Sequence, residues 1–231
     1  MQDFVCKNNM ILQNIARKIL RIYPLIRSKS FVIINRWIFI LHGAKLGTNV
    51  RIFDRVYLRM MKGAKLTLGD NFVFSSGNGI NPLCRNIRGE INITENGEIA
   101  IGNNTGISSA CIWAKSKISI GERVNIGGDC IIMDTDAHNH DWQIRAGMIQ
   151  SHEKTVSDYL TAKAAPIKIC NDVFIGTRCI ILKGVVIGAR SIIAAGSVVT
   201  KSIPSDCIAA GNPCRVIKML SFESNTLKAH D

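Results

Sequence analysis

The sequence lacks several patterns that would place it in a common class. It has no apolar run of about 20 residues, the length that a membrane-spanning helix needs, because Asn35 and Arg36 interrupt the apolar stretch 31–41. Its eight cysteines form no C-x-x-C pair and no metal-ligand spacing, and the start of the chain lacks the early apolar run of a secretory signal. Unpaired cysteines favour a reducing compartment, so we expect a cytoplasmic protein.

Aromatic residues are also scarce, at 6% of the chain, while basic residues are in excess. The net charge of +12 predicts an anionic partner, which could be nucleic acid, a membrane surface or a phosphate-bearing cofactor. A nucleic-acid binder would interleave its basic residues with aromatics or carry a known module, and neither is present. We therefore expect no nucleic-acid partner.

The strongest pattern is a repeat of six residues between 167 and 201. Aliphatic residues recur at every sixth position, and small or aliphatic residues recur two places before them. The first set is Ile169, Ile175, Ile181, Ile187, Ile193 and Val199, and the second is Val173, Cys179, Val185, Ser191 and Ser197. A period of six fits neither a helix nor a simple alternating strand. It predicts a coil of short parallel strands, three to a turn, with both sets inside, and with Gly176, Gly184 and Gly188 at the bends.

The same six-residue repeat extends back to Leu46, with slips where its spacing changes. It passes through Ile101, Ile107 and Trp113, and then, one residue late, through Ile120, Ile126 and Ile132. We expect the slips to be bulges or short loops at the corners of the coil. On this register Cys111, Cys130 and Cys179 occupy inward positions as small buried side chains.

Residues 1–42 form a separate, basic segment. Apolar residues with the spacing of one helical face predict an amphipathic helix that ends or kinks near Pro24. The segment has seven basic residues and one acidic residue. It could lie on an anionic membrane surface or cap the first coil, and the two roles are compatible.

The repeat stops at His138, where an insertion of residues 139–166 begins. His138 and His140 lie among Asp134, Asp136 and Asp141 in a chain that has only five histidines. Long loops on rigid scaffolds often carry function, and a histidine beside a carboxylate can act as a general base. We favour His138, because it occupies the next position of the six-residue repeat, and either Asp136 or Asp134 could orient it.

Taken together, these motifs resemble the hexapeptide-repeat acyltransferases. They are the hexads, the sequence D-T-D-A-H that ends at His138, Arg145 seven residues later, the run A-A-G-S-V-V-T-K and the ending G-N-P-C-R-V-I-K. The likeness is greatest to the maltose and galactoside O-acetyltransferases and to the polysaccharide O-acetyltransferases. It is strong from 101 to 220, weak from 46 to 99 and absent before Leu46.

The resemblance implies an all-β fold, a left-handed parallel β-helix over residues 43–220, followed by a C-terminal tail at 221–231. It also implies a homotrimer with acetyl-CoA in a groove between neighbouring coils and the active site at a subunit interface. The reaction would be direct acetyl transfer to a hydroxyl of a sugar or surface-polysaccharide precursor, with no metal. His138 would be the catalytic base, and a backbone N–H would stabilise the oxyanion. Of the two carboxylates that could orient it, we name Asp136 as the catalytic partner.

By the same resemblance, six positions would contact CoA: Thr177, Ala195, Thr200, Lys201, Arg215 and Lys218. The three cations suit the phosphates of CoA, although lysine at 218, where relatives carry arginine, cannot bind a phosphate in the bidentate way. Ser108 stands near the place of an acceptor-binding asparagine, and we expect it to face the acceptor with His140 and Arg145. We assign Trp142, Met148 and Tyr159 to packing.

Three alternatives remain. The same base and groove would serve N-acetylation of an amino sugar. A non-catalytic trimer could act as a scaffold or binding module at a membrane, and the basic segment 1–42 would equally suit an enzyme with a lipid-linked sugar acceptor. A zinc-dependent carbonic anhydrase shares the fold, but it needs three histidines on facing coils, and His138 and His140 lie too close together in the sequence.

Overall fold

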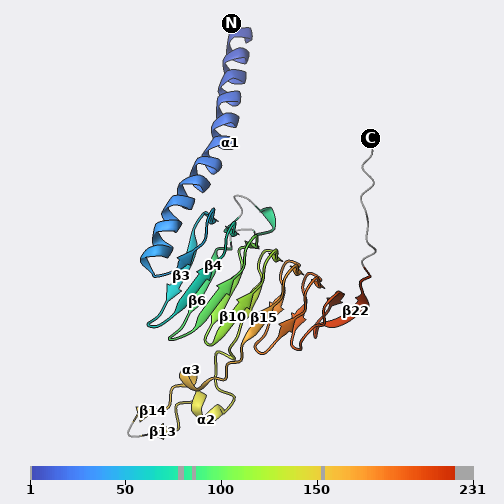
Figure 1. The fold of residues 1–231 in the computed structure, drawn as a ribbon. Coiled ribbons are helices and arrows are strands. Elements are labelled where there is room, and N and C mark those ends of the chain that lie inside the picture. The colour runs from blue at the N-terminus through green and yellow to red at the C-terminus, as the bar shows by residue number, and fades with distance from the viewer. Residues whose placement is uncertain (1, 78–80, 85–86, 152–153, 222–231) are drawn as a thin grey trace.

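The chain folds as a left-handed parallel β-helix with a long helix at its N-terminal end (Figure 1). This is a computed structural model, which describes residues 2–77, 81–84, 87–151 and 154–221. Within residues 2–28 it describes only some of the side chains. Three sheets form the walls of a prism, and one strand from each sheet makes one coil. The predicted fold class is confirmed.

Each sheet takes every third strand of the repeat. Sheet A contains β1 (Lys45–Leu46), β4 (Lys65–Leu68), β7 (Glu98–Ile101), β10 (Lys117–Ile120), β15 (Ile167–Ile169) and β18 (Val186–Ile187). Sheet B contains β2 (Arg51–Phe53), β5 (Val73–Ser75), β8 (Gly106–Ser108), β11 (Asn125–Ile126), β16 (Phe174–Ile175), β19 (Ile192–Ile193), β21 (Cys207–Ala210) and β22 (Arg215–Met219). Sheet C contains β3 (Val56–Met60), β6 (Gly89–Ile93), β9 (Cys111–Ala114), β12 (Ile131–Met133), β17 (Ile180–Ile181) and β20 (Val198–Val199). All pairings within these sheets are parallel except that of β21 with β22.

The six-residue repeat forms the buried column that it predicts. All six aliphatic positions from Ile169 to Val199 are buried, as are the five positions two places earlier. Two of those five are serines, and each donates its hydroxyl to a carbonyl: Ser191 to Pro204 and Ser197 to Ala194, both at 2.6 Å. The column therefore accepts small polar side chains where the backbone offers a hydrogen-bond partner.

The glycines at the bends have two different roles. Gly184 has a φ of +75°, as expected of a glycine at a tight corner. At Gly176, by contrast, an added Cβ would lie 2.6 Å from the backbone nitrogen of Ala195 in the next coil, and at Gly188 one would lie 2.3 Å from that of Ser205. Close approach between coils, rather than positive φ, explains glycine at these two positions.

Two predicted inward positions, Trp113 and Cys111, are wrong. Trp113 lies on the outer face of sheet C, because Ile112 and Ala114 beside it fill the core. Cys111 shares that outer face and is half-buried, whereas Cys130 and Cys179 are buried as predicted. The step from Ile107 to Ile112 is five residues, made possible by the tight turn at Ser109, whose φ is +36°.

The N-terminal segment is one continuous helix, α1 (Gln2–Leu41), which runs through Pro24 and leaves the β-helix at its N-terminal end (Figure 1). Its last turns pack on β2, where Phe39 is buried and the Asn35 amide donates to the carbonyls of Ile52 (2.9 Å) and Asp54 (2.7 Å). Arg27 adds an ion pair with Asp54 at 2.8 Å. The C-terminal part of α1 thus caps the first coil, while its contact with a membrane stays a prediction.

Two irregular segments interrupt the coils. Residues 76–88, with the short 3-10 helix η1 (Pro82–Cys84), connect sheet B to sheet C in the second coil. Residues 134–166 connect sheet C to sheet A in the fourth coil and contain α2 (Trp142–Arg145), β13 (Gln150–Ser151), β14 (Lys154–Thr155) and α3 (Asp158–Thr161). Figure 1 shows the second segment projecting from one edge of the prism.

Candidate active site

Segment 134–166 leaves the β-helix through a fixed stem. Asp134 is buried and accepts hydrogen bonds from the backbone N–H groups of Lys115 (2.6 Å) and Ser116 (2.8 Å) in the preceding coil. Burial raises the pKa of its carboxyl, and these backbone donors oppose the shift. Thr135 then forms an antiparallel bridge with Ala164. The two arms of the segment are therefore held together where they meet the coil.

His138 lies just beyond this stem and is paired with Asp158. Its Nδ1 lies 2.5 Å from Oδ2 of Asp158, and the other carboxylate oxygen accepts the N–H of Asn139 at 2.6 Å. The His138 side chain is 70% exposed. Because the carboxylate accepts, Nδ1 carries the proton in the neutral ring, which leaves the lone pair on Nε2, the arrangement of a general base.

The position and the hydrogen bonds of Asp158 keep its carboxyl group ionised. It is the first residue of α3, and Ser157 caps that helical turn by accepting the N–H of Leu160. The hydrogen bond with His138, and then that with the Asn139 N–H, hold the pKa of Asp158 below its usual range. The carboxylate is therefore ionised near neutral pH and would stabilise a positive charge on His138.

The carboxylates expected to orient His138 have other partners. Asp136 pairs with Lys183 (Oδ1 to Nζ, 2.6 Å) and with His140 (Oδ2 to Nε2, 3.1 Å), while Asp134 is engaged at the stem. Asp158, twenty residues away in the sequence, takes the position predicted for Asp136. Sequence reasoning missed it because the insertion folds back on itself.

Arg145 supports the same loop from α2. Its Nη1 donates to the carbonyl of Asn139 at 2.6 Å, next to His138. Two residues assigned to packing, Trp142 and Met148, are exposed in this chain. Tyr159 is half-buried, as that assignment predicts, and stacks on Trp113 with ring centroids 6.1 Å apart and planes at 14°.

Lys115 fastens α3 to sheet C. Its Nζ donates to the carbonyls of Tyr159 (2.7 Å), Leu160 (3.0 Å) and Ala162 (2.7 Å) and lies 5.1 Å from the centre of the Tyr159 ring. Because α3 also carries Asp158, the face of sheet C fixes the carboxylate that holds His138.

Three of the other predicted residues line one groove on sheet B. The groove has a volume of about 580 Å³, and Ser108, Thr177 and Ala195 contribute to its wall. The Ser108 hydroxyl lies 3.2 Å from that of Ser75 and also accepts from the Asn81 amide, while Thr177 donates its hydroxyl to the carbonyl of Gly128. Asn81 belongs to the segment 76–88, which thus borders this groove.

The remaining predicted CoA contacts lie near the C-terminal end of the β-helix. Thr200 and Lys201 are exposed at the turn after β20, the same edge of the prism from which His138 projects two coils earlier. Arg215 and Lys218 are exposed on β22. One chain therefore places His138, Thr200 and Lys201 at the edge between sheets C and A, and Ser108, Thr177 and Ala195 on sheet B.

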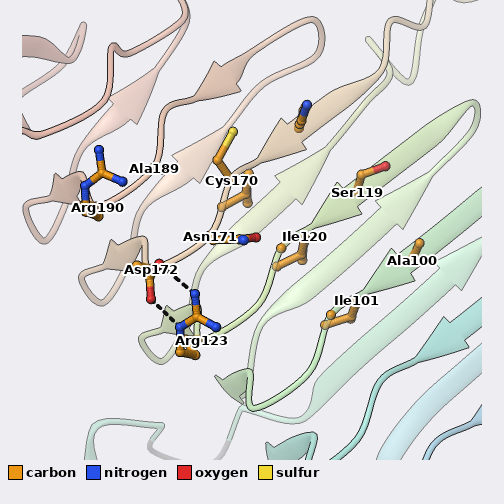
Figure 2. Close-up of a pocket in the computed structure, with 14 residues that line it drawn as sticks. Ala100, Ile101, Ser119, Ile120, Arg123, Cys170, Asn171, Asp172, Ala189 and Arg190 are labelled. Carbon is orange, nitrogen blue, oxygen red and sulfur yellow. Dashed lines mark hydrogen bonds and ion pairs between the residues drawn. The ribbon is translucent and has the colours of Figure 1, made fainter.

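A further cavity, of about 720 Å³, lies on sheet A and contains none of the predicted site residues (Figure 2). Its polar side includes Arg123 and Asp172, which form a two-fold ion pair at 2.6 and 3.0 Å, with Arg190 close by. The Arg123 hydrogen bond lowers the pKa of Asp172. Since Arg123 and Arg190 are already paired with carboxylates, and none of the predicted site residues lies here, we do not place the chemistry there.

The described residues contain no group of three or more potential metal ligands of the His, Cys, Asp or Glu type. None of the described helices has the combination of length and hydropathy that a membrane crossing requires.

Family models support the hexapeptide assignment. The model described as "Bacterial transferase hexapeptide (six repeats)" matches residues 166–201, and "Hexapeptide repeat of succinyl-transferase" matches residues 117–133.

Curated relatives match a short part of the chain. A 2,3,4,5-tetrahydropyridine-2,6-dicarboxylate N-acetyltransferase of Staphylococcus aureus is 45% identical over 65 residues, and the galactoside O-acetyltransferase of Escherichia coli is 54% identical over 56 residues. These alignments cover 28% and 24% of this chain, and the chain spans 27% and 28% of the length of those relatives.

Among solved structures, a variant of the N-acyltransferase AntD from Bacillus cereus, in complex with dTDP-4-amino-4,6-dideoxyglucose and coenzyme A, has a TM-score of 0.57 at 18% identity. That match covers 78% of this chain and 84% of the other. At this identity the likeness concerns the fold. This likeness in fold, the matches to the repeat models and the buried six-residue repeat together confirm the predicted resemblance. This chain carries the hexapeptide repeat of the bacterial transferases, wound as the left-handed β-helix of the hexapeptide-repeat acyltransferases.

Proposed function

We propose that this protein is an acetyltransferase that moves the acetyl group of acetyl-CoA to a hydroxyl of a sugar or of a surface-polysaccharide precursor. The observation that carries the proposal is the His138–Asp158 pair. An exposed imidazole, held through Nδ1 by an ionised carboxylate, presents Nε2 as a base at the edge of a rigid β-helix. The curated relatives that match part of the chain include both O- and N-acetyltransferases.

The chemistry is a direct transfer. Nε2 of His138 takes the proton of the acceptor hydroxyl as that oxygen attacks the thioester carbonyl of acetyl-CoA. Asp158 stabilises the imidazolium that forms, as the carboxylate of a Ser-His-Asp triad does. When the tetrahedral intermediate collapses, the C–S bond breaks and the CoA thiolate receives the proton from His138. No acyl-enzyme is formed, and the histidine ends the cycle neutral.

The arrangement of the predicted residues supports a site shared between subunits. His138 and the groove with Thr177 and Ala195 lie on different sides of one chain. The base and the groove predicted for CoA therefore meet most simply when a second copy of the chain lies beside the first. We therefore propose a homotrimer in which the segment 134–166 of one subunit faces the sheet B groove of its neighbour. Lys201, Arg215 and Lys218 would bind the phosphates of CoA.

The oxygen acceptor is preferred because the galactoside O-acetyltransferase matches with the higher identity of the two relatives described, 54% against 45%. An amino sugar is the second candidate, since AntD, which shares the fold, is an N-acyltransferase solved with an amino sugar nucleotide. The same base serves both acceptors, because an attacking amine must also lose a proton.

The test is acceptor-dependent release of CoA. The full chain is incubated with acetyl-CoA and a panel of galactosides, maltose and amino sugar nucleotides, and both CoA and the acetylated product are measured by chromatography and mass spectrometry. We expect turnover with a hydroxyl acceptor. Turnover with amino sugars alone would favour N-acetylation, and absence of both turnover and acetyl-CoA binding would refute the acyltransferase assignment and favour the scaffold.

A further inference from the structure

A third cavity lies beside α3, the helical turn that carries the partner of the candidate base. It lies between the outer face of sheet C and α3, has a volume of about 690 Å³, and is roofed by Tyr159 and Leu160. Arg59, Asn92 and Trp113 stand side by side along its floor, because they are register partners in β3, β6 and β9. The volume suits a small-molecule ligand. The helical turn that closes the cavity also carries Asp158.

Three polar atoms in the walls of this cavity lack partners. Oδ1 of Asn92, Nε1 of Trp113 and the hydroxyl of Tyr159 are shielded from solvent and make no hydrogen bond to any described residue. Leaving a buried polar group unpaired destabilises the folded state, so native proteins rarely keep three such groups together without a use. Their position in one cavity points to a ligand that supplies the missing bonds.

From these groups we infer that the cavity is the acceptor pocket and that it takes a sugar ring, an inference that rests on the proposed acetyl transfer. Asn92 Oδ1 needs a donor, Trp113 Nε1 needs an acceptor, and the Tyr159 hydroxyl can use either. A hydroxyl group is both donor and acceptor, so a polyol ring satisfies all three. A carboxylate could not donate to Asn92, and an ammonium could not accept from Trp113.

The rest of the wall fits the same ligand class. The ring of Trp113 adds an apolar surface beside these polar atoms, and one face of a sugar ring is lined by C–H groups that pack on such a surface. Arg59 and Glu95 add planar polar side chains of opposite charge, and the ammonium of Lys115 already donates to three backbone carbonyls, so the lining suits neutral hydroxyls better than a free anion. Because the three unpaired atoms are shielded, binding requires a small rotation of Asn92 or Tyr159.

Trp113 offers a direct binding test that does not depend on catalysis. Replacing the exposed Trp37 and Trp142 by phenylalanine leaves Trp113 as the single tryptophan. Its fluorescence is titrated with galactose, maltose, N-acetylglucosamine and UDP-N-acetylglucosamine, and with cyclohexanecarboxylate as a ring that lacks neutral hydroxyls. We expect a saturable change with at least one sugar and none with the carboxylate. No saturable change with any sugar would overturn the pocket assignment.

Two conservative variants extend the test to turnover. Tyr159→Phe and Asn92→Leu each remove one unpaired atom and should raise the acceptor KM about tenfold, the value of one hydrogen bond to a ligand, while the KM for acetyl-CoA changes less than twofold. Since neither removed atom bonds within the described protein, the melting temperature should not fall. Unchanged acceptor KM in both variants, with transfer intact, would refute the pocket and leave the proposed function standing. Sugar binding in the fluorescence titration without any acetyl transfer would support the pocket and refute the proposed acetyl transfer.

Discussion

The edge between sheets C and A is built in two ways in consecutive coils. In the fifth coil, residues 182–185 make a short turn in which Gly184 donates to the carbonyl of Ala165 at 3.0 Å. In the fourth coil, segment 134–166 spans the same edge. The buried column is continuous through both, with Ile132 and Ile181 equally buried. The core therefore does not depend on the length of this connection.

The difference shows how the fold separates stability from chemistry. The short turn bonds to neighbouring segments through its backbone, as Gly184 does to Ala165, and it carries a single charged side chain, that of Lys183. The long segment carries His138, Asp158 and Arg145, but it is not loose, since Lys115 and the Trp113–Tyr159 stack fix α3 to the coil. A rigid attachment is what a base needs if its nitrogen is to meet a reacting hydroxyl within hydrogen-bond reach.

The largest expected effect comes from removing the base that the long segment carries. His138→Ala should lower kcat by on the order of a thousandfold, the usual contribution of a general base, while binding of acetyl-CoA is unchanged. The matched control is His42→Gln, an exposed histidine at the end of α1, which should leave kcat as it is. Kinetics with the preferred acceptor and calorimetry with acetyl-CoA measure the two quantities. Turnover within tenfold of the wild type in His138→Ala would remove the assignment.

A smaller effect should follow from removing the partner of His138. Asp158→Asn replaces a charged hydrogen bond with a neutral one, so kcat should fall about tenfold to a hundredfold. Asp136→Asn is the comparison variant, since that carboxylate pairs with Lys183 and His140 instead, and we expect a loss of less than tenfold. A larger loss in Asp136→Asn than in Asp158→Asn would restore the sequence-based choice of Asp136.

The same pair sets a pH dependence. The hydrogen bond with His138 holds the pKa of Asp158 below its ordinary value of 3.8. A carboxyl whose pKa is lowered on folding stabilises the folded state above the unfolded pKa, and this contribution is lost as pH falls through the lowered value. The advantage of the wild type over Asp158→Asn in melting temperature should therefore persist above pH 3.8 and shrink as the pH falls below that value, where the two melting temperatures converge.

The fold was predictable because the repeat is local. Each six-residue unit marks its own inward position, so Ile169 to Val199 could be placed without knowledge of distant contacts. The misplacement of Trp113 has the same origin, since a five-residue step leaves the hexad count one residue out of phase. The alternation of Ile112 and Ala114 around it was the signal that could have corrected the register.

The candidate site was predictable only in part, because its pairs are not local. His138 stands out by its motif, but its partner depends on how the insertion folds back, and no spacing rule connects residues 138 and 158. Trp113 lies on β9 and Lys115 directly follows that strand, and nothing in their own neighbourhood marks them as contacts of α3. The stacking of parallel coils brings such residues into contact although many residues separate them in the sequence.

The smallest effect we expect tests that attachment. Lys115→Met removes the ammonium that three carbonyls of the α3 region share, so the turn that carries Asp158 loses its tether. Since the loss acts on Asp158 through position alone, kcat should fall by about three- to tenfold, less than for the direct loss of a charged hydrogen bond. The melting temperature should change little, because Lys115 lies outside the buried column. Lys115→Arg keeps a cation that can reach the same carbonyls and should recover most of the rate. If Lys115→Met retained full kcat, the stack of Trp113 on Tyr159 would be sufficient to hold α3, and the double variant Lys115→Met with Tyr159→Ala would then have to lower kcat for the attachment itself to matter.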